Sequence, residues 1–328
     1  MESFASDQEV RWCPGCGDYA ILASVQKVLP ELGIERENTV FISGIGCSSR
    51  FPYYLNTYGF HTIHGRAPTI ATGLKIARPD LSVWVVTGDG DGLSIGASHL
   101  LHLMRRNLNI TVLLFNNRIY GLTKGQYSPT SEKGKKTKTT PQGSIDQPFS
   151  PVSLALAAGC SFVARGIDVD SKGLQWILKA AAAHNGTSFV EIYQNCNVFN
   201  DGAFAQISDR GLRAQRTVTL HPGKPLIYGQ NNDSGLVYNG HGFESISLAT
   251  PEDMAKVHVH QNTDSIAMAT LLNELPFPEF PVPIGIFRAV ARPTYEEELS
   301  AQIHKAKTQQ PKACLDSLLR SGKTWEIQ

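Results

Sequence analysis

Residues 82–117 read SVWVVTGDGDGLSIGASHLLHLMRRNLNITVLLFNN, with polar residues gathered after each of two apolar runs. The runs, 82–87 and 110–115, are rich in β-branched residues and are typical of buried strands. A segment of helix length, 94–107, lies between them. Two continuous apolar strands joined by a helix predict a βαβ unit, in which the strands run parallel and both faces of the sheet are covered.

The same alternation continues on both sides of this unit. Further strands are predicted at 39–43 and 188–193, and further helices at 18–29, 67–78, 151–158 and 171–184. We therefore expect a doubly wound α/β domain over residues 1–200, with a parallel sheet and helices on both faces. Ligands of such sheets bind at the carboxyl ends of the strands, which is where Gly44, Gly88 and Asn116 lie.

Two segments depart from the alternation. Residues 120–151 are rich in Lys, Thr, Gly and Pro and have no periodicity, which is typical of a functional or mobile loop. Beyond residue 201 turn signals multiply, with one helix predicted at 263–275. We expect residues 201–328 to form an extended C-terminal tail that packs on the core and on a partner, and not a second independent core.

Composition restricts the class of protein. Of 328 residues, 41% are hydrophobic, which is ample for a large core. The formal net charge of +1 gives no bias toward nucleic acid or membranes, and no apolar run approaches the roughly 20 residues that span a bilayer. The start, MESFASDQEV, shows no secretory signal, so six cysteines indicate a reducing compartment, with the cytoplasm as the default.

The polar residues after the two apolar runs are suited to a metal. Gly88-Asp89-Gly90 follows the first run and Asn116-Asn117 follows the second. Magnesium prefers oxygen ligands and keeps phosphates in its shell, and a neutral amide beside a diphosphate avoids excess negative charge. The plainer alternative is a tight turn followed by an Asn-rich loop. A nicotinamide fingerprint does not fit, because Ile95 and Ser49 stand where its third glycine belongs.

Four cysteines lie in a turn or directly after predicted strands: Cys13, Cys16, Cys47 and Cys196. Four thiolates that the fold brings together suit a cubane iron–sulfur cluster. A zinc site usually has two local pairs of ligands, and a thioredoxin-type pair needs a preceding strand; four unrelated buried thiols are the plainest alternative. Cys160 and Cys314 lie in apolar or helical contexts and are interpreted as packed free thiols.

Taken in order, the motifs resemble the β subunit of the 2-oxoacid:ferredoxin oxidoreductases over essentially the whole chain. They are Trp12-Cys13-Pro14-Gly15-Cys16-Gly17, Gly44-Ile45-Gly46-Cys47-Ser48, His64-Gly65-Arg66-Ala67, Gly88-Asp89-Gly90-Asp91, Asn116-Asn117, Tyr120-Gly121-Leu122-Thr123-Lys124-Gly125-Gln126 and the late Cys196. The resemblance implies the thiamine diphosphate-binding fold. It also implies thiamine diphosphate, Mg²⁺ and one [4Fe-4S] cluster as cofactors.

By this resemblance Cys13, Cys16, Cys47 and Cys196 bind the cluster, while Asp89, the Asn117 side chain and the Ile119 carbonyl bind magnesium. The expected cofactor-binding residues are Gly46, Cys47, Ser48, His64, Gly65, Gly88, Asp89, Gly90, Asp91, Asn117, Ile119, Gly121, Leu122 and Thr123. Lys124, His64 and Arg66 are the candidate catalytic residues. The alternative for His64 is a capping residue, and the alternative for Lys124 is a solvated loop lysine.

The implied reaction is the oxidative decarboxylation of a 2-oxoacid with coenzyme A to acyl-CoA and CO2, with electrons passing through the cluster to ferredoxin. The tail, with Trp325 near its end, looks most like the 2-oxoglutarate group; pyruvate or a broad range of 2-oxoacids is the alternative. A separate α subunit is expected to supply the glutamate that activates thiamine, in an (αβ)2 assembly. The chain alone is therefore expected to be inactive.

Two other functions were weighed. A thiamine-dependent decarboxylase or synthase without redox chemistry leaves the four cysteines unexplained. A subunit that only transfers electrons leaves Asp89 and Asn117 without a role.

Overall fold

The computed structural model of the chain describes residues 4–263, 265–309 and 314–327. Its main feature is an eight-stranded sheet with the order β2-β1-β3-β4-β6-β5-β11-β7. These strands are β1 (Thr39–Ser43), β2 (Tyr58–His61), β3 (Ser82–Gly88), β4 (Ile110–Asn116), β5 (Phe162–Ile167), β6 (Ser188–Tyr193), β7 (Thr217–Leu220) and β11 (Val282–Ala289). The four strands predicted from apolar runs are β1, β3, β4 and β6, and all four are confirmed.

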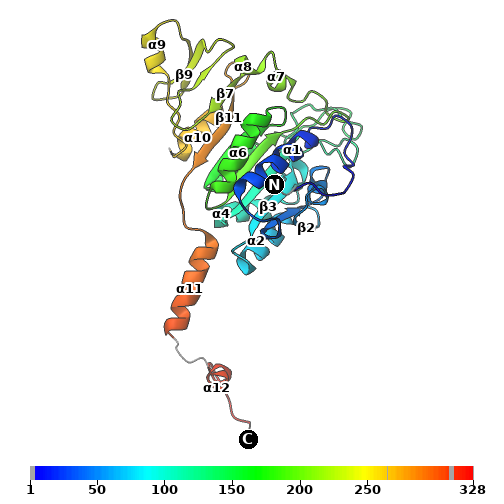
Figure 1. Cartoon of the computed structure of the whole chain (residues 1–328), viewed down its shortest axis with the longest axis vertical. Coiled ribbons are helices and arrows are strands. Elements are labelled where there is room, and N and C mark those ends of the chain that lie inside the picture. The colour runs from blue at the N-terminus through cyan, green and yellow to red at the C-terminus, as the bar shows by residue number, and fades with distance from the viewer. Residues whose placement is uncertain (1–3, 264, 310–313, 328) are drawn as a thin grey trace.

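Helices cover both faces of this sheet (Figure 1). The α-helices of the first two thirds of the chain are α1 (Asp18–Val28), α2 (Ala67–Ala77), α3 (Asp89–Leu93), α4 (Ala97–Arg106), α5 (Pro151–Ala157), α6 (Ser171–Ala183), α7 (Ala205–Ser208) and α8 (Arg213–Arg216). Short 3-10 helices are η1 (Leu29–Leu32), η2 (Arg36–Asn38) and η3 (Ser48–Tyr54). The predicted helices are thus confirmed, apart from residues 94–96, which precede α4.

The two faces follow from the alternation of side chains along each strand. Val83 and Val85 of β3 belong to one apolar cluster, together with residues of α2, α4 and α5. Trp84 and Val86 point to the other face and belong to a second cluster, together with residues of α1 and α6. Because both faces are apolar, the central strands are buried throughout, as a doubly wound sheet requires.

The six strands from residues 1–200 run parallel, which confirms the expected fold class, and two strands from the C-terminal region extend the same sheet. β11 pairs antiparallel with β5 and parallel with β7, so these two C-terminal strands run against the other six. Both come from the region beyond residue 201, which therefore completes the edge of the sheet. Parallel pairing between distant segments has no local sequence signal, since neither strand forms a hairpin with its neighbour.

The rest of the C-terminal region lies outside the sheet. A three-stranded antiparallel sheet contains β8 (Ile227–Tyr228), β9 (Ser234–Tyr238) and β10 (Phe243–Ser247). The remaining helices are α9 (Pro251–Lys256), α10 (Ile266–Asn273), α11 (Tyr295–Gln309) and α12 (Leu315–Leu319). The helix predicted at 263–275 is α10, and Asp264 lies outside the described residues.

Figure 1 shows α11 leaving the body of the molecule toward the C-terminus. No helix in the described ranges combines the length and the apolar character needed to cross a membrane.

Candidate functional site

The carboxylate of Asp89 lies at the carboxyl end of β3, where α3 begins. It is buried, and Ser128 Oγ and Thr130 Oγ1 donate hydrogen bonds to its Oδ2 at 2.5 and 2.6 Å. Burial raises the pKa of Asp89, and the two hydroxyl donors oppose that rise. Both hydroxyls come from the loop at 120–151 that has no periodicity in the sequence. The loop therefore closes over the end of β3.

The Asn116-Asn117 pair forms the turn that follows β4. Asn116 Oδ1 accepts from the Arg118 N–H at 3.3 Å, and Asn117 Oδ1 accepts from the Ile119 N–H at 3.1 Å. These are two successive Asx turns, and Arg118 adopts the left-handed conformation with φ 57° that reverses the chain. Thr130 Oγ1 lies 2.9 Å from Asn116 Oδ1, so one hydroxyl contacts both this turn and Asp89.

Asp91 organises the next part of the site. Its Oδ1 accepts from His64 Nδ1 at 2.5 Å, from the Gly65 N–H at 2.7 Å and from the Ile45 N–H at 3.1 Å. Its Oδ2 accepts from Thr87 Oγ1 at 2.6 Å. Asp91 is buried, and its four hydrogen bonds join the ends of β1 and β3 to the loop that contains His64. Its oxygens are used within the protein and do not face an open cavity.

Three glycine-containing loops surround Asp89 and Asp91. The loop after β1 contains Gly46, Cys47 and Ser48, and a Cβ on Gly88 would lie 3.4 Å from Ser48 Oγ. Tyr120 donates its hydroxyl to the Gly90 carbonyl at 3.0 Å, with its ring against the Gly90 Cα. The structure therefore brings these predicted cofactor residues to one edge of the sheet.

The candidate cationic residues differ in their surroundings. Arg66 Nη1 donates to the carbonyls of His64 and Ile95, each at 3.3 Å, so its guanidinium joins two loops. Lys124 is exposed, has φ 74°, and lies on a turn closed by its N–H bond to the Gly121 carbonyl at 3.0 Å. Leu122 and Thr123 lie on the same turn. Lys124 is thus the more available cation.

The four predicted cluster ligands come together although their positions in the sequence are far apart. The Gly17 N–H donates to the Asn195 carbonyl at 3.1 Å, which brings the Cys13–Cys16 turn beside the segment that follows β6. A Cβ on Gly121 would lie 3.5 Å from both Cys47 Sγ and Cys196 Sγ. All four are free thiols; Cys47 lies close enough to Cys13 and Cys196, and Cys16 to Cys47 and Cys196, for their charges to interact. Cys160 is packed in the core as expected, but Cys314 is exposed, so the interpretation of Cys314 as a packed thiol is wrong.

The four thiols differ in exposure: Cys13 is exposed, and Cys16, Cys47 and Cys196 are partly buried. Burial, with the nearby Asp18 carboxylate as the second cause, raises the pKa of Cys47 to about 12 and also raises that of Cys16. Gln194 Nε2 donates to Cys16 Sγ at 3.3 Å, and Trp12 Nε1 donates to the Cys47 carbonyl at 2.7 Å. Burial and the nearby carboxylate thus both favour the thiol form of Cys16 and Cys47, whereas a bound cationic centre would favour their thiolates.

Within the described residues no group of three or more His, Cys, Asp or Glu side chains is spaced for a single metal ion. The magnesium site expected from the sequence has a different composition. It has one carboxylate from Asp89, one amide from Asn117 and one main-chain carbonyl from Ile119.

Several functional residues were not found from the sequence. Ser128 and Thr130 belong to a loop without periodicity, and only the fold shows that they contact Asp89. Glu191 lies within the predicted strand at 188–193, SFVEIY, and the strand pattern predicts no role for it. A single carboxylate inside an apolar strand is a signal that could have identified it, because buried charges are rare unless paired.

Comparisons with known proteins agree with this geometry. Residues 44–192 match the family described as thiamine pyrophosphate enzyme, C-terminal TPP binding domain. The chain is 55% identical over 332 residues to the 2-oxoglutarate oxidoreductase subunit KorB of Mycobacterium tuberculosis, covering 99% of this chain and 88% of the relative. It is 50% identical over 201 residues to the 2-oxoacid:ferredoxin oxidoreductase 1 subunit beta of Aeropyrum pernix, covering 61% of this chain and 63% of that one.

A solved structure also matches. It is the 2-oxoglutarate:ferredoxin oxidoreductase from Magnetococcus marinus with 2-oxoglutarate, coenzyme A and succinyl-CoA bound. The TM-score is 0.76 at 33% identity, over 98% of this chain and 95% of that chain.

Fold and site thus define a thiamine diphosphate-dependent enzyme domain. More narrowly, the chain belongs to the β subunits of the 2-oxoacid:ferredoxin oxidoreductases. The resemblance found in the sequence is thereby confirmed, and a β subunit implies a separate α subunit.

Proposed function

We propose that this chain is the β subunit of an enzyme that oxidatively decarboxylates 2-oxoglutarate with coenzyme A, giving the acyl-CoA and CO2 and reducing ferredoxin. The relatives from M. tuberculosis and M. marinus carry 2-oxoglutarate in their names, which supports this substrate over pyruvate. The main structural support is Gly121. It follows the predicted magnesium ligand Ile119 by two residues, and its Cα faces the sulfurs of Cys47 and Cys196. One turn thus contacts both proposed cofactor sites.

The residues around Asp89 fit magnesium and a diphosphate. Both hydroxyl donors use Oδ2 of Asp89, so we assign Oδ1 to the cation. The Asx turns orient the Asn117 amide and the Ile119 carbonyl as the other two protein ligands. When bound, thiamine diphosphate supplies the group that stabilises the carbanion left by decarboxylation. The chain's own task is to bind the diphosphate, exclude water and orient the reacting end.

The four clustered cysteines fit a [4Fe-4S] cluster. The Gly121 backbone, with no side chain, leaves the space between Cys47 and Cys196 that an inorganic core requires. The test is iron, sulfide and zinc content of protein purified without oxygen. We expect about four irons and four sulfides per chain, lost in Cys47→Ser and retained in the exposed Cys314→Ser. Zinc, or no metal, would reject the cluster and favour thiamine chemistry without electron transfer.

Lys124 is the candidate for recognising the distal carboxylate of 2-oxoglutarate. It is the exposed cation, whereas Arg66 already binds two carbonyl groups. Lys124→Ala should raise KM for 2-oxoglutarate by about tenfold and leave KM for pyruvate nearly unchanged, since one ionic hydrogen bond contributes about 1.4 kcal/mol. Lys133→Ala, an exposed lysine elsewhere, is the control. Equal losses with both substrates would argue against this role.

The α subunit is required because the described site contains no assigned glutamate for thiamine activation. We expect the chain alone to be inactive and the αβ complex, in an (αβ)2 assembly, to be active with ferredoxin. Turnover by the purified β subunit would show that the α subunit is not needed to activate thiamine. Light scattering of the complex would check the assembly.

The C-terminal residues 201–328 are proposed to pack on the core and on the α subunit. Asn109 N–H donates to Glu296 Oε1 at 3.0 Å, which fixes the start of α11 to the body. Beyond that point the large apolar side chains exposed in the described residues are Ile303, Leu315, Leu318, Leu319, Trp325 and Ile327. Truncation after residue 294 should leave the β-subunit core folded and reduce co-purification of the α subunit. Unchanged co-purification would contradict this proposal.

A further inference from the structure

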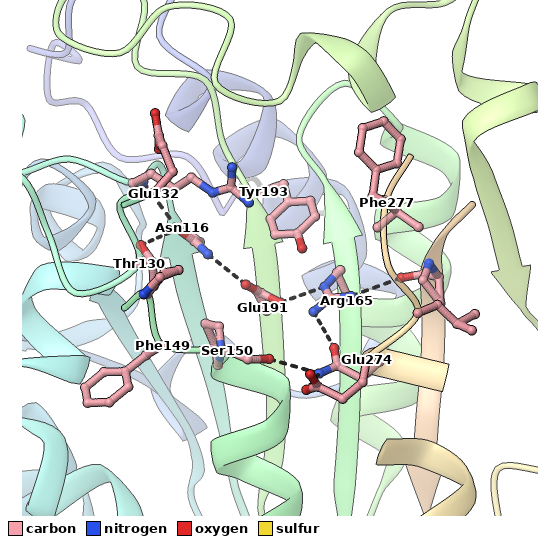
Figure 2. A pocket seen from close by; sticks show the side chains of 17 residues that line it. Asn116, Thr130, Glu132, Phe149, Ser150, Arg165, Glu191, Tyr193, Glu274 and Phe277 are labelled. Atoms are coloured by element: carbon pink, nitrogen blue, oxygen red, sulfur yellow. Dashed lines mark hydrogen bonds and ion pairs between the residues drawn. The ribbon is translucent and has the colours of Figure 1, made fainter. Parts of the chain in front are cut away.

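A cavity of about 330 Å³ lies beside the Asn116-Asn117 turn, at the carboxyl ends of β4, β5 and β6. Figure 2 shows a line of polar side chains across it, linked by hydrogen bonds from Thr130 through Asn116 and Glu191 to Arg165. These four residues come from three strands and one loop, and all four are buried. Such a chain of buried polar groups is costly unless every member has a partner.

Glu191 is the centre of this chain. It is fully buried, and each carboxylate oxygen has a different partner. Asn116 Nδ2 donates to Oε1 at 2.8 Å, and Arg165 Nε donates to Oε2 at 2.7 Å. A buried ion pair of this kind contributes little net stability compared with apolar side chains of the same volume. Stability alone therefore does not explain why a carboxylate is present here.

Arg165 is fixed on its other side by the C-terminal region. Its Nη2 donates to Asn273 Oδ1 of α10 at 2.7 Å, and Nη1 donates to the Pro283 carbonyl of β11 at 3.4 Å. The guanidinium also lies over the Tyr193 ring, 5.1 Å from its centroid. With so many contacts Arg165 has little freedom to move, and it presents Nε to Glu191 in one direction.

The amide orientation of Asn116 follows from this. Because Nδ2 faces Glu191, Oδ1 must face the opposite way, toward Thr130 Oγ1 and the Arg118 N–H. The reversed amide would place an NH2 group against the Arg118 N–H, where two donors would meet. The carboxylate thus selects the amide orientation that forms the first Asx turn. That turn contains Asn117.

We infer that Glu191, oriented by Arg165, is a positioning residue for the magnesium and diphosphate site. It acts through Asn116, which shapes the turn carrying Asn117 and shares the Thr130 hydroxyl with Asp89. The inference rests on the proposed cofactor site. It adds a role for two buried residues that do not themselves touch a cofactor, and it links α10 and β11 of the C-terminal region to that site.

The decisive variant is Glu191→Gln, tested in the αβ complex. A glutamine offers one acceptor and one donor, and Arg165 would take the acceptor. The amide NH2 would then face Asn116 and force that residue to reverse. We expect thiamine diphosphate to bind about 10- to 100-fold more weakly at fixed Mg²⁺, the range typical for residues that orient metal ligands. Isothermal titration calorimetry measures this without relying on turnover.

A compensating double variant separates positioning from general damage. In Glu191→Gln with Asn116→Asp, the glutamine NH2 can donate to the new carboxylate, which also accepts from the Arg118 N–H. The buried charge is kept but moved by one residue along the chain of hydrogen bonds. We expect this double variant to regain most of the lost cofactor affinity. Glu31→Gln, which removes an ion pair with Lys179 between η1 and α6, is the matched control.

Three results would overturn the inference. One is a folded Glu191→Gln complex that binds thiamine diphosphate as the wild type does. Another is a double variant with no higher affinity than Glu191→Gln, which would indicate a purely structural ion pair. The third is a wild-type complex that does not bind magnesium and thiamine diphosphate, which would reject the proposed cofactor site together with the inference. If Glu191→Gln fails to fold, a double variant that folds and binds the cofactor supports the inference.

Discussion

His64 and Asp91 are joined by a hydrogen bond of 2.5 Å between Nδ1 and Oδ1, although 27 positions separate them in the sequence. The carboxylate accepts, so Nδ1 of His64 carries a proton. Nε2 is then the free nitrogen of a half-exposed side chain. The bond therefore fixes the orientation of the His64 ring, while the other three donors to Asp91 fix the carboxylate.

Two substitutions of His64 separate its two nitrogens. Asparagine places a donor near the position of Nδ1, so His64→Asn should keep the bond to Asp91 and lose only contact with the diphosphate. Glutamine places its donor near Nε2, so His64→Gln should lose the Asp91 bond and about 1.5–3 kcal/mol of unfolding free energy. Urea unfolding and thiamine diphosphate titration measure the two effects. If both variants lose the same unfolding free energy, the hydrogen bond between His64 and Asp91 does not stabilise the loop that contains His64.

The contact between Tyr120 and Gly90 makes a second prediction. A Cβ on Gly90 would lie 2.2 Å from a ring carbon of Tyr120, so Gly90→Ala must displace the ring and its bond to the Gly90 carbonyl. We expect cofactor affinity to fall about tenfold or more, since a bond that orders the cofactor loop is lost. The control is Gly73→Ala, where the added methyl meets open space within α2. It should raise the unfolding free energy by about 0.5–1 kcal/mol.

The sequence predicts those strands whose own residues form a continuous apolar run. β3 and β4 are apolar on both faces, and continuous apolar runs identify such strands. β5 was missed because its sequence, FVARGI, contains Arg165, whose partner Glu191 lies on the neighbouring strand. β2 was missed because all four of its residues are exposed, so it has no apolar signal.

The site divides in the same way. Asp89 and Asn117 belong to a spaced motif and were identified directly, and the four cysteines were grouped on their positions after turns and strands. Ser128 and Thr130 are not identified by the sequence. Their hydroxyls donate hydrogen bonds to Asp89 only because the irregular loop folds back over the end of β3. Local patterns identify groups fixed by strand ends. They do not identify side chains that a long loop brings to the site when it folds.

His184 is the source of a pH-dependent effect on stability. Burial lowers its pKa below the ordinary value of 6.5. Its Nε2 lies 2.7 Å from Ser161 Oγ, and because that hydroxyl gives its proton to Asn107 Oδ1, the ring nitrogen is assigned as the donor. Below pH 6.5 the unfolded chain therefore takes up a proton that the folded chain resists, so stability is complete at higher pH and falls as pH decreases through this window. His184→Gln keeps a donor for Ser161 but cannot titrate.

We expect the difference in urea midpoint between about pH 7.5 and 5.5 to be smaller in His184→Gln than in the wild type. The exposed His241→Gln is the control and should behave as the wild type. If His184→Gln and the wild type lose the same stability over this interval, another group is responsible for the pH dependence.

Gly121 gives the sharpest test of where the cluster binds. An alanine Cβ there would lie 3.5 Å from Cys47 Sγ and Cys196 Sγ, an ordinary van der Waals distance, so the cluster-free chain should accept it. A bound iron–sulfur core would need that same space. Gly121→Ala should therefore leave the thermal midpoint of the cluster-free protein unchanged and reduce iron to less than about half of the wild-type content, since well-packed sites tolerate no added methyl. Gly242→Ala, where the methyl meets open space, is the control. Full iron content in Gly121→Ala would show that the core does not lie between these two sulfurs.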